Sequence, residues 1–276
     1  MVHPGVYSPC IVNADEEGLL RRLMELVYSR GRVWGRLIDT RDAWQVQPGS
    51  SLAEDDVRTA PYHLSHSAWH ALTVGVDHFR CLHSSLAGEI RGNMASIQIH
   101  SHAQFSLVRG AIENSARAVW MLGPTDRVDR VSHRLALGVM ELNPSYRLLE
   151  LVRKRAPRTK DERYEQLRQM AIAAEVQEAD VNRVLNSARY FKIVREAGAL
   201  ISIGADFAEV VWRGCSALAH GDIAGTVALV DREEVARSDG VTTVRVTGSI
   251  GVMYAFADTA ATMIDRGFTL YQQAAR

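Results

Sequence analysis

Residues 95–122 read ASIQIHSHAQFSLVRGAIENSARAVWML, and this stretch decides the fold class. Its apolar side chains recur at helical spacing and cover most of the circumference of the expected helix, which ends at Gly123-Pro124. A helix that is apolar on most sides must be surrounded by other elements, because its side chains would otherwise face water. The stretch therefore predicts a central helix inside a mainly α-helical protein.

Hydrophobic residues at helical spacing continue outward from this segment, from Asp15 to Gln273. Two β-rich runs, Thr226–Val230 and Val241–Thr247, flank Asp239-Gly240 and predict a hairpin. The fold class expected is mainly α: a helical bundle with a small β-hairpin inserted before the last helix, and strands only at about residues 226–248. Further helices are predicted over residues 15–36, 61–90, 126–155, 161–174, 179–189, 206–220 and 249–273.

The chain, residues 1–276, is expected to form a single helical domain. The alternative is a weak division near residues 156–160, in a basic connection that contains Pro157. Helix periodicity is found on both sides of that connection, and no internal repeat is visible. A single domain is therefore the preferred interpretation.

The composition is that of a globular protein, with 47% hydrophobic and 23% charged residues. Lysine plus arginine equals aspartate plus glutamate, at 32 each, which argues against duplex binding through a large basic field. Cys10, Cys81 and Cys215 lie far apart, as is typical of reduced thiols. The N-terminal MVHPGVYSPC has no signal-peptide pattern, and the apolar runs are too short for a membrane span. We therefore expect a cytoplasmic protein that does not partner with a membrane.

A polar stripe lies on the segment Asp206–His220, which is expected to be helical. Glu209, Arg213, Ser216 and His220 fall within an arc of roughly 60° on that helix. Arg213 and His220 are two turns apart, and Glu209 is one turn from Arg213, close enough to pair with it. A histidine can exchange a proton with a ribose 2′-hydroxyl or a leaving oxygen, and an arginine can stabilise the charge on phosphate. The stripe therefore suits phosphodiester cleavage that needs no metal.

The segment Arg213-Gly-Cys-Ser-Ala-Leu-Ala-His220 resembles the arginine, four to six residues, histidine motif of the HEPN superfamily. That superfamily consists of small helical bundles, many of them metal-independent endoribonucleases, others nucleotide-binding or non-catalytic. The resemblance covers little more than one helix and implies that Arg213 and His220 are a catalytic pair at a homodimer interface. It also implies RNA as substrate, no cofactor, and a bacterial stress or phage-defence system with an antitoxin or regulatory protein as partner. Gly214 departs from the family, in which the residue after the arginine is often polar.

A second polar stripe lies on the central helix. Arg109, Glu113 and Arg117 follow one another at intervals of one turn and leave one positive charge over, which suits a phosphate. Together with Ser216 and Glu209 they are the candidate substrate-binding residues. The alternative is a buried structural ion network, which produces the same pattern. If the two helices are neighbours, both stripes should face a shared cleft or interface.

Three features have plain structural interpretations beside the functional ones. His63, His66 and His70 share a helix face, and two of them have the spacing of metal ligands, although a hydrophilic outer face explains them without further ligands. The basic run over residues 153–163 suits either RNA phosphates or a solvated loop. The motif at 213–220 itself could be a helix C-cap beside a surface ion pair.

The leading functional hypothesis is a HEPN-like, metal-independent endoribonuclease. The alternative is a non-catalytic helical binding or interaction protein that retains the bundle and a polar cleft, and a metal-binding helical enzyme comes third. The position of His220 separates the first two hypotheses. Catalysis needs an accessible imidazole, whereas a cap needs only the end of a helix.

Overall fold

The computed structural model of the protein describes residues 14–91 and 94–276. Cys10 and the N-terminal stretch MVHPGVYSPC, on which two of the predictions rest, lie outside the described residues. The described chain is made of helices and two antiparallel hairpins, so the fold is mainly α, as predicted. Among its helices, none combines the length and the apolar character that crossing a membrane requires.

The elements are arranged along the chain as follows. The long helices are α1 (Ala14–Asp39), α3 (Leu64–Leu86), α4 (Ala103–Leu122), α5 (Arg127–Leu151) and α11 (Ile250–Ala274). The shorter ones are α2 (Ser51–Thr59), α6 (Lys160–Ala173), η1 (Glu178–Asp180), α7 (Val181–Leu185), α8 (Tyr190–Gly198), α9 (Ala205–His220) and α10 (Ile223–Leu229). The strands are β1 (Ala87–Arg91), β2 (Met94–Ile97), β3 (Asp231–Ser238) and β4 (Val241–Thr247).

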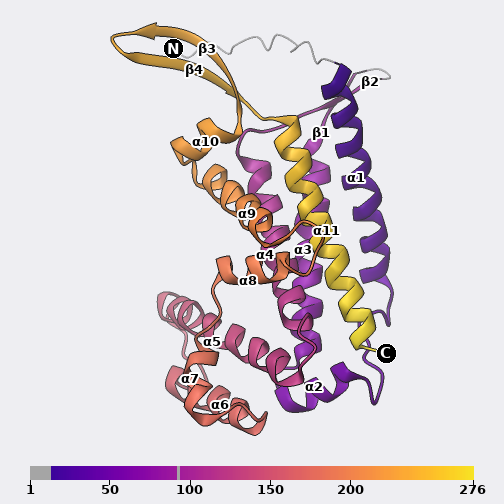
Figure 1. Cartoon of the computed structure of the whole chain (residues 1–276), viewed down its shortest axis with the longest axis vertical. Helices are drawn as coiled ribbons and strands as arrows, with labels where there is room; N and C mark the ends of the chain where they lie inside the picture. The colour runs from indigo at the N-terminus through magenta and orange to yellow at the C-terminus, as the bar shows by residue number, and fades with distance from the viewer. Residues whose placement is uncertain (1–13, 92–93) are drawn as a thin grey trace.

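Helix α4 is the centre of the bundle (Figure 1). It packs against α3, α5, α8, α9 and α11, while α1 covers α3 and α11 on the far side. Phe105, Val108, Ile112 and Val119 on α4 are fully buried. The prediction of a central, deeply packed helix is therefore confirmed, because the apolar side chains of α4 are buried against other helices on nearly every side.

The first hairpin was not predicted. The helix expected over residues 61–90 ends at Leu86, the one expected from residue 95 begins at Ala103, and β1 pairs with β2 between them. The buried side chain of Gln104 explains the late start of α4. Its amide nitrogen donates to the carbonyl oxygens of Ser85 (3.0 Å) and Gln98 (2.8 Å), and its carbonyl oxygen accepts from the backbone N–H of His100 (2.9 Å). These bonds hold residues 98–100 in a non-helical conformation, since they satisfy backbone groups that a helix would pair internally.

The second hairpin is present, but its first strand begins later than predicted. Thr226–Val230, expected as a strand, lies largely in α10, and β3 starts at Asp231. The Asp222 carboxylate accepts a hydrogen bond from the backbone N–H of Gly225 and so caps α10, which explains the helix. Both strands are exposed along most of their length, and the hairpin projects from one end of the bundle (Figure 1). Because its side chains are exposed, β3 has no alternating apolar pattern from which its start could be predicted.

Helices α2 and α8, like α10, lie where no helix was predicted, and the helix expected over residues 179–189 is shortened to η1 and α7. Helices α5, α6 and α7 share a second hydrophobic core, which includes Val131, Leu142, Leu167 and Val181. This core uses side chains from both sides of residues 156–160. That segment therefore connects two helices of one core.

A buried ion pair fastens α2 to α5. The Arg130 guanidinium donates from Nε to Oδ2 of Asp55 (2.6 Å) and from Nη2 to Oδ1 (3.0 Å). Asp55 is fully buried and Arg130 is 8% exposed. Nη1 of the same arginine donates to the carbonyl oxygens of Pro124 and Thr125, at the start of α5. The ion pair is therefore bidentate, and Nη1 of Arg130 is satisfied by backbone acceptors.

Candidate functional site

The polar stripe of α9 lies opposite a buried apolar face, as the helical wheel predicts. Val211, Cys215 and Leu218 are fully buried, whereas Phe207 in the first turn is 45% exposed. The helix ends at Gly221, whose left-handed conformation (φ 70°) lets its N–H bond to the Leu218 carbonyl oxygen. His220 is thus the last helical residue, and its imidazole is exposed.

The stripes of α4 and α9 meet where these two helices pack together. Nη1 of Arg109 lies 3.0 Å from Nε2 of His220. Nε of Arg109 donates to Oε1 of Glu113 (2.8 Å), and the same oxygen accepts from the indole N–H of Trp212 (2.7 Å). Residues that are 111 positions apart in the chain therefore form one continuous polar cluster.

Trp212 is the centre of this cluster, and the sequence analysis missed it. Its ring centroid lies 5.9 Å from the guanidinium carbon of Arg109 and 5.8 Å from that of Arg213, within the range of cation–π contacts. The one signal in the sequence was a tryptophan at the edge of a polar stripe, because an indole N–H that is partly buried needs an acceptor. Through Trp212, Arg213 joins the Arg109–Glu113 pair.

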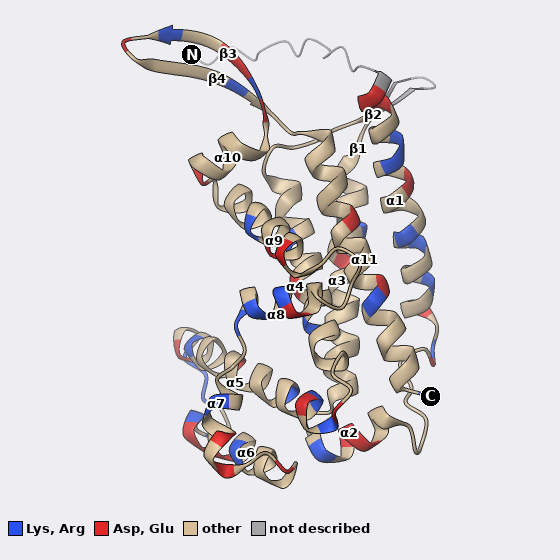
Figure 2. Ribbon diagram, in the orientation of Figure 1, with Lys and Arg blue, Asp and Glu red and all other residues tan. Residues whose placement is uncertain are grey.

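A second ion network surrounds Arg213. Nη2 of Arg213 lies 2.7 Å from Oε1 of Glu209, as the spacing predicts, and Arg195 of α8 reaches the other oxygen at 3.1 Å. The hydrogen bonds from Arg213 and then Arg195 lower the pKa of Glu209. Figure 2 shows basic and acidic positions on α8 and on α9, two helices that pack against each other. Arg213 is nevertheless 62% exposed, so its charge is accessible to a ligand.

Two other candidates have different surroundings. Ser216 is half-buried on α9, one turn before His220 and on the same face. Arg117, in contrast, pairs with Glu141 of α5 and does not join the cluster. The extra positive charge expected from Arg109, Glu113 and Arg117 is therefore neutralised by Glu141, away from the cluster.

Gly214 departs from the HEPN pattern for a packing reason. It is buried, and a Cβ atom at this position would approach Phe256 Cζ at 2.9 Å and Leu229 Cδ1 at 3.0 Å. A polar side chain after Arg213 would have to enter this apolar contact, which would cost both packing and solvation energy. The glycine thus allows α9 to approach α11 and α10 closely.

The contact with Arg109 defines the state of the His220 ring. A guanidinium has only donors, so a hydrogen bond in this contact requires the tautomer in which Nε2 of His220 accepts and Nδ1 carries the proton. An unprotonated Nε2 is the form that can accept a proton from a hydroxyl group. Cys215 of α9 is fully buried, and burial raises the pKa of its thiol. A buried thiol of this kind is inert, so Cys215 is not a candidate nucleophile.

The histidine face of α3 has its own contacts. The rings of His63 and His66 stack with centroids 4.9 Å apart, and Nδ1 of His63 lies 3.7 Å from Oδ2 of Asp56. Within residues 14–91 and 94–276, no three histidine, cysteine, aspartate or glutamate side chains lie close enough to hold a metal ion. The face is partly exposed, with His66 and His70 open to solvent.

The cluster around His220 is a surface site. The two cavities described in the molecule lie elsewhere, one between α5 and α6 and the other between α1 and α3. No protein-family model, curated protein or solved structure matches the chain. What the protein does must therefore be argued from the cluster itself.

Proposed function

We propose that the protein is a HEPN-like, metal-independent endoribonuclease whose reactive centre is His220 with Arg109 and Arg213. The observation that carries this proposal is the contact between Nη1 of Arg109 and Nε2 of His220 on an exposed junction of two helices. It joins a proton acceptor to a fixed positive charge, which are the two groups that cleavage of a phosphodiester requires.

The reaction begins when a phosphate of single-stranded RNA displaces Nε2 of His220 from Arg109. Nε2 then accepts the proton of the ribose 2′-hydroxyl, and the 2′-oxygen forms a bond to phosphorus. The bond from phosphorus to the 5′-oxygen breaks, and that oxygen takes a proton from the imidazolium or from water. The products are a 2′,3′-cyclic phosphate and a 5′-hydroxyl, and neither metal nor cofactor takes part.

Arg109 and Arg213 stabilise the charge that builds up on the phosphate oxygens. Glu113 holds Arg109, and Glu209 holds Arg213, so both guanidiniums are oriented before RNA arrives. Trp212 makes a cation–π contact with each of the two arginines and helps to position both. Ser216, Glu209 and Glu113 act in this proposal by positioning, while the two arginines contact the substrate.

A homodimer is part of the proposal, because an open surface holds a flexible strand better when a second copy covers it. Phe207, Val210 and Ile223, on α9 and α10, are exposed apolar side chains on this part of the chain and support such a contact. The resemblance to HEPN proteins also suggests a stress or phage-defence role and a regulatory protein partner, such as an antitoxin.

The proposal is tested by incubating the full chain with single-stranded RNA of mixed sequence in the presence of EDTA. A DNA strand of the same sequence is the matched control, since it lacks the 2′-hydroxyl. We expect RNA to be cut and DNA to stay intact, with the rate unaffected by the chelator. Cleavage that appears only when a metal is added, or cleavage of both strands, would refute the mechanism.

The alternative is a non-catalytic helical binding or interaction protein that retains the bundle and a polar cleft. It is favoured by the fact that both functional groups already have protein partners: Arg213 is bound to Glu209, and His220 to Arg109. Such a network can be structural only. RNA that is retained by the protein but not cut in the experiment above would support this alternative.

A further inference from the structure

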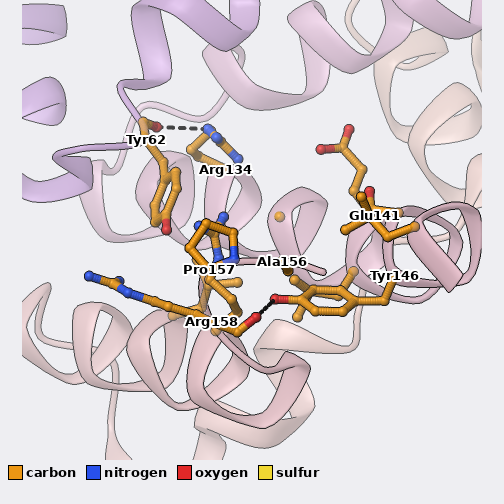
Figure 3. Close-up of a pocket in the computed structure, with 13 residues that line it drawn as sticks. Tyr62, Arg134, Glu141, Tyr146, Ala156, Pro157 and Arg158 are labelled. Carbon is orange, nitrogen blue, oxygen red and sulfur yellow. Dashed lines mark hydrogen bonds between the residues drawn. The ribbon is translucent and has the colours of Figure 1, made fainter. Parts of the chain in front are cut away.

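A cavity of about 400 Å³ lies between α5, the connection that follows it, and α6. Figure 3 shows Tyr62 and Arg134 on one side of the cavity and Glu141 and Tyr146 on the other. Pro157 and Arg158 come from the connection between the two helices. The basic run noted in the sequence therefore contributes to a hollow, as well as to the surface.

Three arginines line this cavity, and none of them makes an ion pair with a carboxylate in the described part of the chain. Nε of Arg134 donates to the Tyr62 carbonyl oxygen (2.9 Å), and Nη1 of Arg158 donates to Oε1 of Gln166 (2.7 Å). The Arg163 guanidinium lies 4.6 Å from the centroid of the Tyr62 ring. All three guanidiniums therefore line the cavity without a carboxylate bound to them.

The one acidic side chain that lines the cavity does not compensate these charges. Glu141 pairs with Arg117 of α4. Nε of Arg117 is buried without a hydrogen-bond partner among the described residues. Burial, together with the charge of Arg117, lowers the pKa of Arg134 to about 10. Arg134 is still charged at neutral pH, so an anion in the cavity would stabilise it.

The remaining wall of the cavity is largely apolar. Leu142, Leu149, Leu167 and Pro157 contribute aliphatic surface, and the Tyr146 ring is held in place by a hydrogen bond from its hydroxyl to the Arg158 carbonyl oxygen (2.7 Å). A ligand that fills the site must therefore carry an apolar body as well as an anionic group.

We propose that this cavity binds a small phosphate monoester with an apolar or aromatic body. Three guanidiniums without a bound carboxylate line the cavity. They match a group that carries nearly two negative charges and three acceptor oxygens better than they match a carboxylate. The proposal does not depend on RNA cleavage, because the cavity is lined by α5 and α6 and by none of the residues around His220.

The test is isothermal titration of the full chain with phenyl phosphate, which has the charge and the ring but no further groups. We expect it to bind, and inorganic phosphate to bind about tenfold more weakly because it buries no apolar surface. Arg134→Met should raise the Kd of phenyl phosphate by about ten- to a hundredfold, since a charged hydrogen bond is lost. Arg147→Met, an exposed arginine on the same helix that pairs with Glu150, is the matched control and should leave the Kd unchanged.

Circular dichroism shows whether Arg134→Met is folded, and Arg158→Gln replaces it if it is not, because Arg158 is exposed. Binding that is the same in the wild type and in these folded variants would overturn the proposal. So would equal binding of neutral phenol, or no binding of phenyl phosphate up to about 10 mM. Benzoate bound as tightly as phenyl phosphate would overturn the assignment to a phosphate.

Discussion

His220→Ala is expected to cleave single-stranded RNA about 10²–10⁴-fold more slowly than the wild type, which is the usual contribution of a general acid–base residue. The variant removes the imidazole that accepts the proton of the 2′-hydroxyl in the proposed mechanism. Folding should be unchanged, because His220 is exposed at the end of α9 and Arg109 is still held by Glu113. The measurement is the single-turnover rate in EDTA, with circular dichroism to confirm the fold.

His70→Ala is the matched control for this experiment. His70 is an exposed histidine of α3, outside the cluster, so its loss should leave the rate unchanged. Both variants remove an imidazole, but only His220→Ala removes the imidazole that contacts Arg109. Equal rates for His220→Ala and the wild type would contradict the assignment and favour the binding-protein alternative.

Asp55→Ala is expected to lower the free energy of unfolding by about 3–5 kcal/mol. The substitution leaves the Arg130 guanidinium buried without its carboxylate, and only the carbonyl oxygens of Pro124 and Thr125 stay as acceptors. Because α2 is fastened to α5 through this pair, the second core should loosen as well. Urea denaturation followed by circular dichroism measures the effect.

Glu54→Ala tests whether the loss of stability in Asp55→Ala arises because the Asp55–Arg130 pair is buried. Glu54 is adjacent to Asp55, pairs with Arg127 and is half-exposed, so its removal should cost less than about 1 kcal/mol. Similar losses for Asp55→Ala and Glu54→Ala would show that the buried pair contributes no more than a surface pair. The double substitution Asp55→Leu with Arg130→Met should recover part of the stability, because no buried charge is then left alone.

The sequence predicted those parts of the fold that depend on apolar periodicity. Residues 95–122 were recognised as the central helix because nearly every face of α4 is buried. The first hairpin was not predicted, because the hydrogen bonds of Gln104 to Ser85 and Gln98 form only in the folded chain and leave no periodic pattern in the sequence. The strand β3 was misplaced because its side chains face solvent on both sides, so that no burial pattern marks its start.

For the candidate site, the sequence predicted what a single helix can show. The pairing of Arg213 with Glu209 follows from their spacing on α9. Arg195 could not be found, because it reaches Glu209 only in the folded chain, where α8 packs against α9. The preference of Arg117 for Glu141 was hidden for the same reason, since it depends on how α4 packs against α5.

The central claim is that His220 and its arginines cleave RNA through the ribose 2′-hydroxyl. Mass spectrometry of the new ends, after cleavage in EDTA, tests it most directly. The proposed mechanism predicts a 2′,3′-cyclic phosphate on one fragment and a 5′-hydroxyl on the other, because the 2′-oxygen attacks the phosphorus. A 5′-phosphate with a 3′-hydroxyl would mean that water was the nucleophile, and would contradict the account.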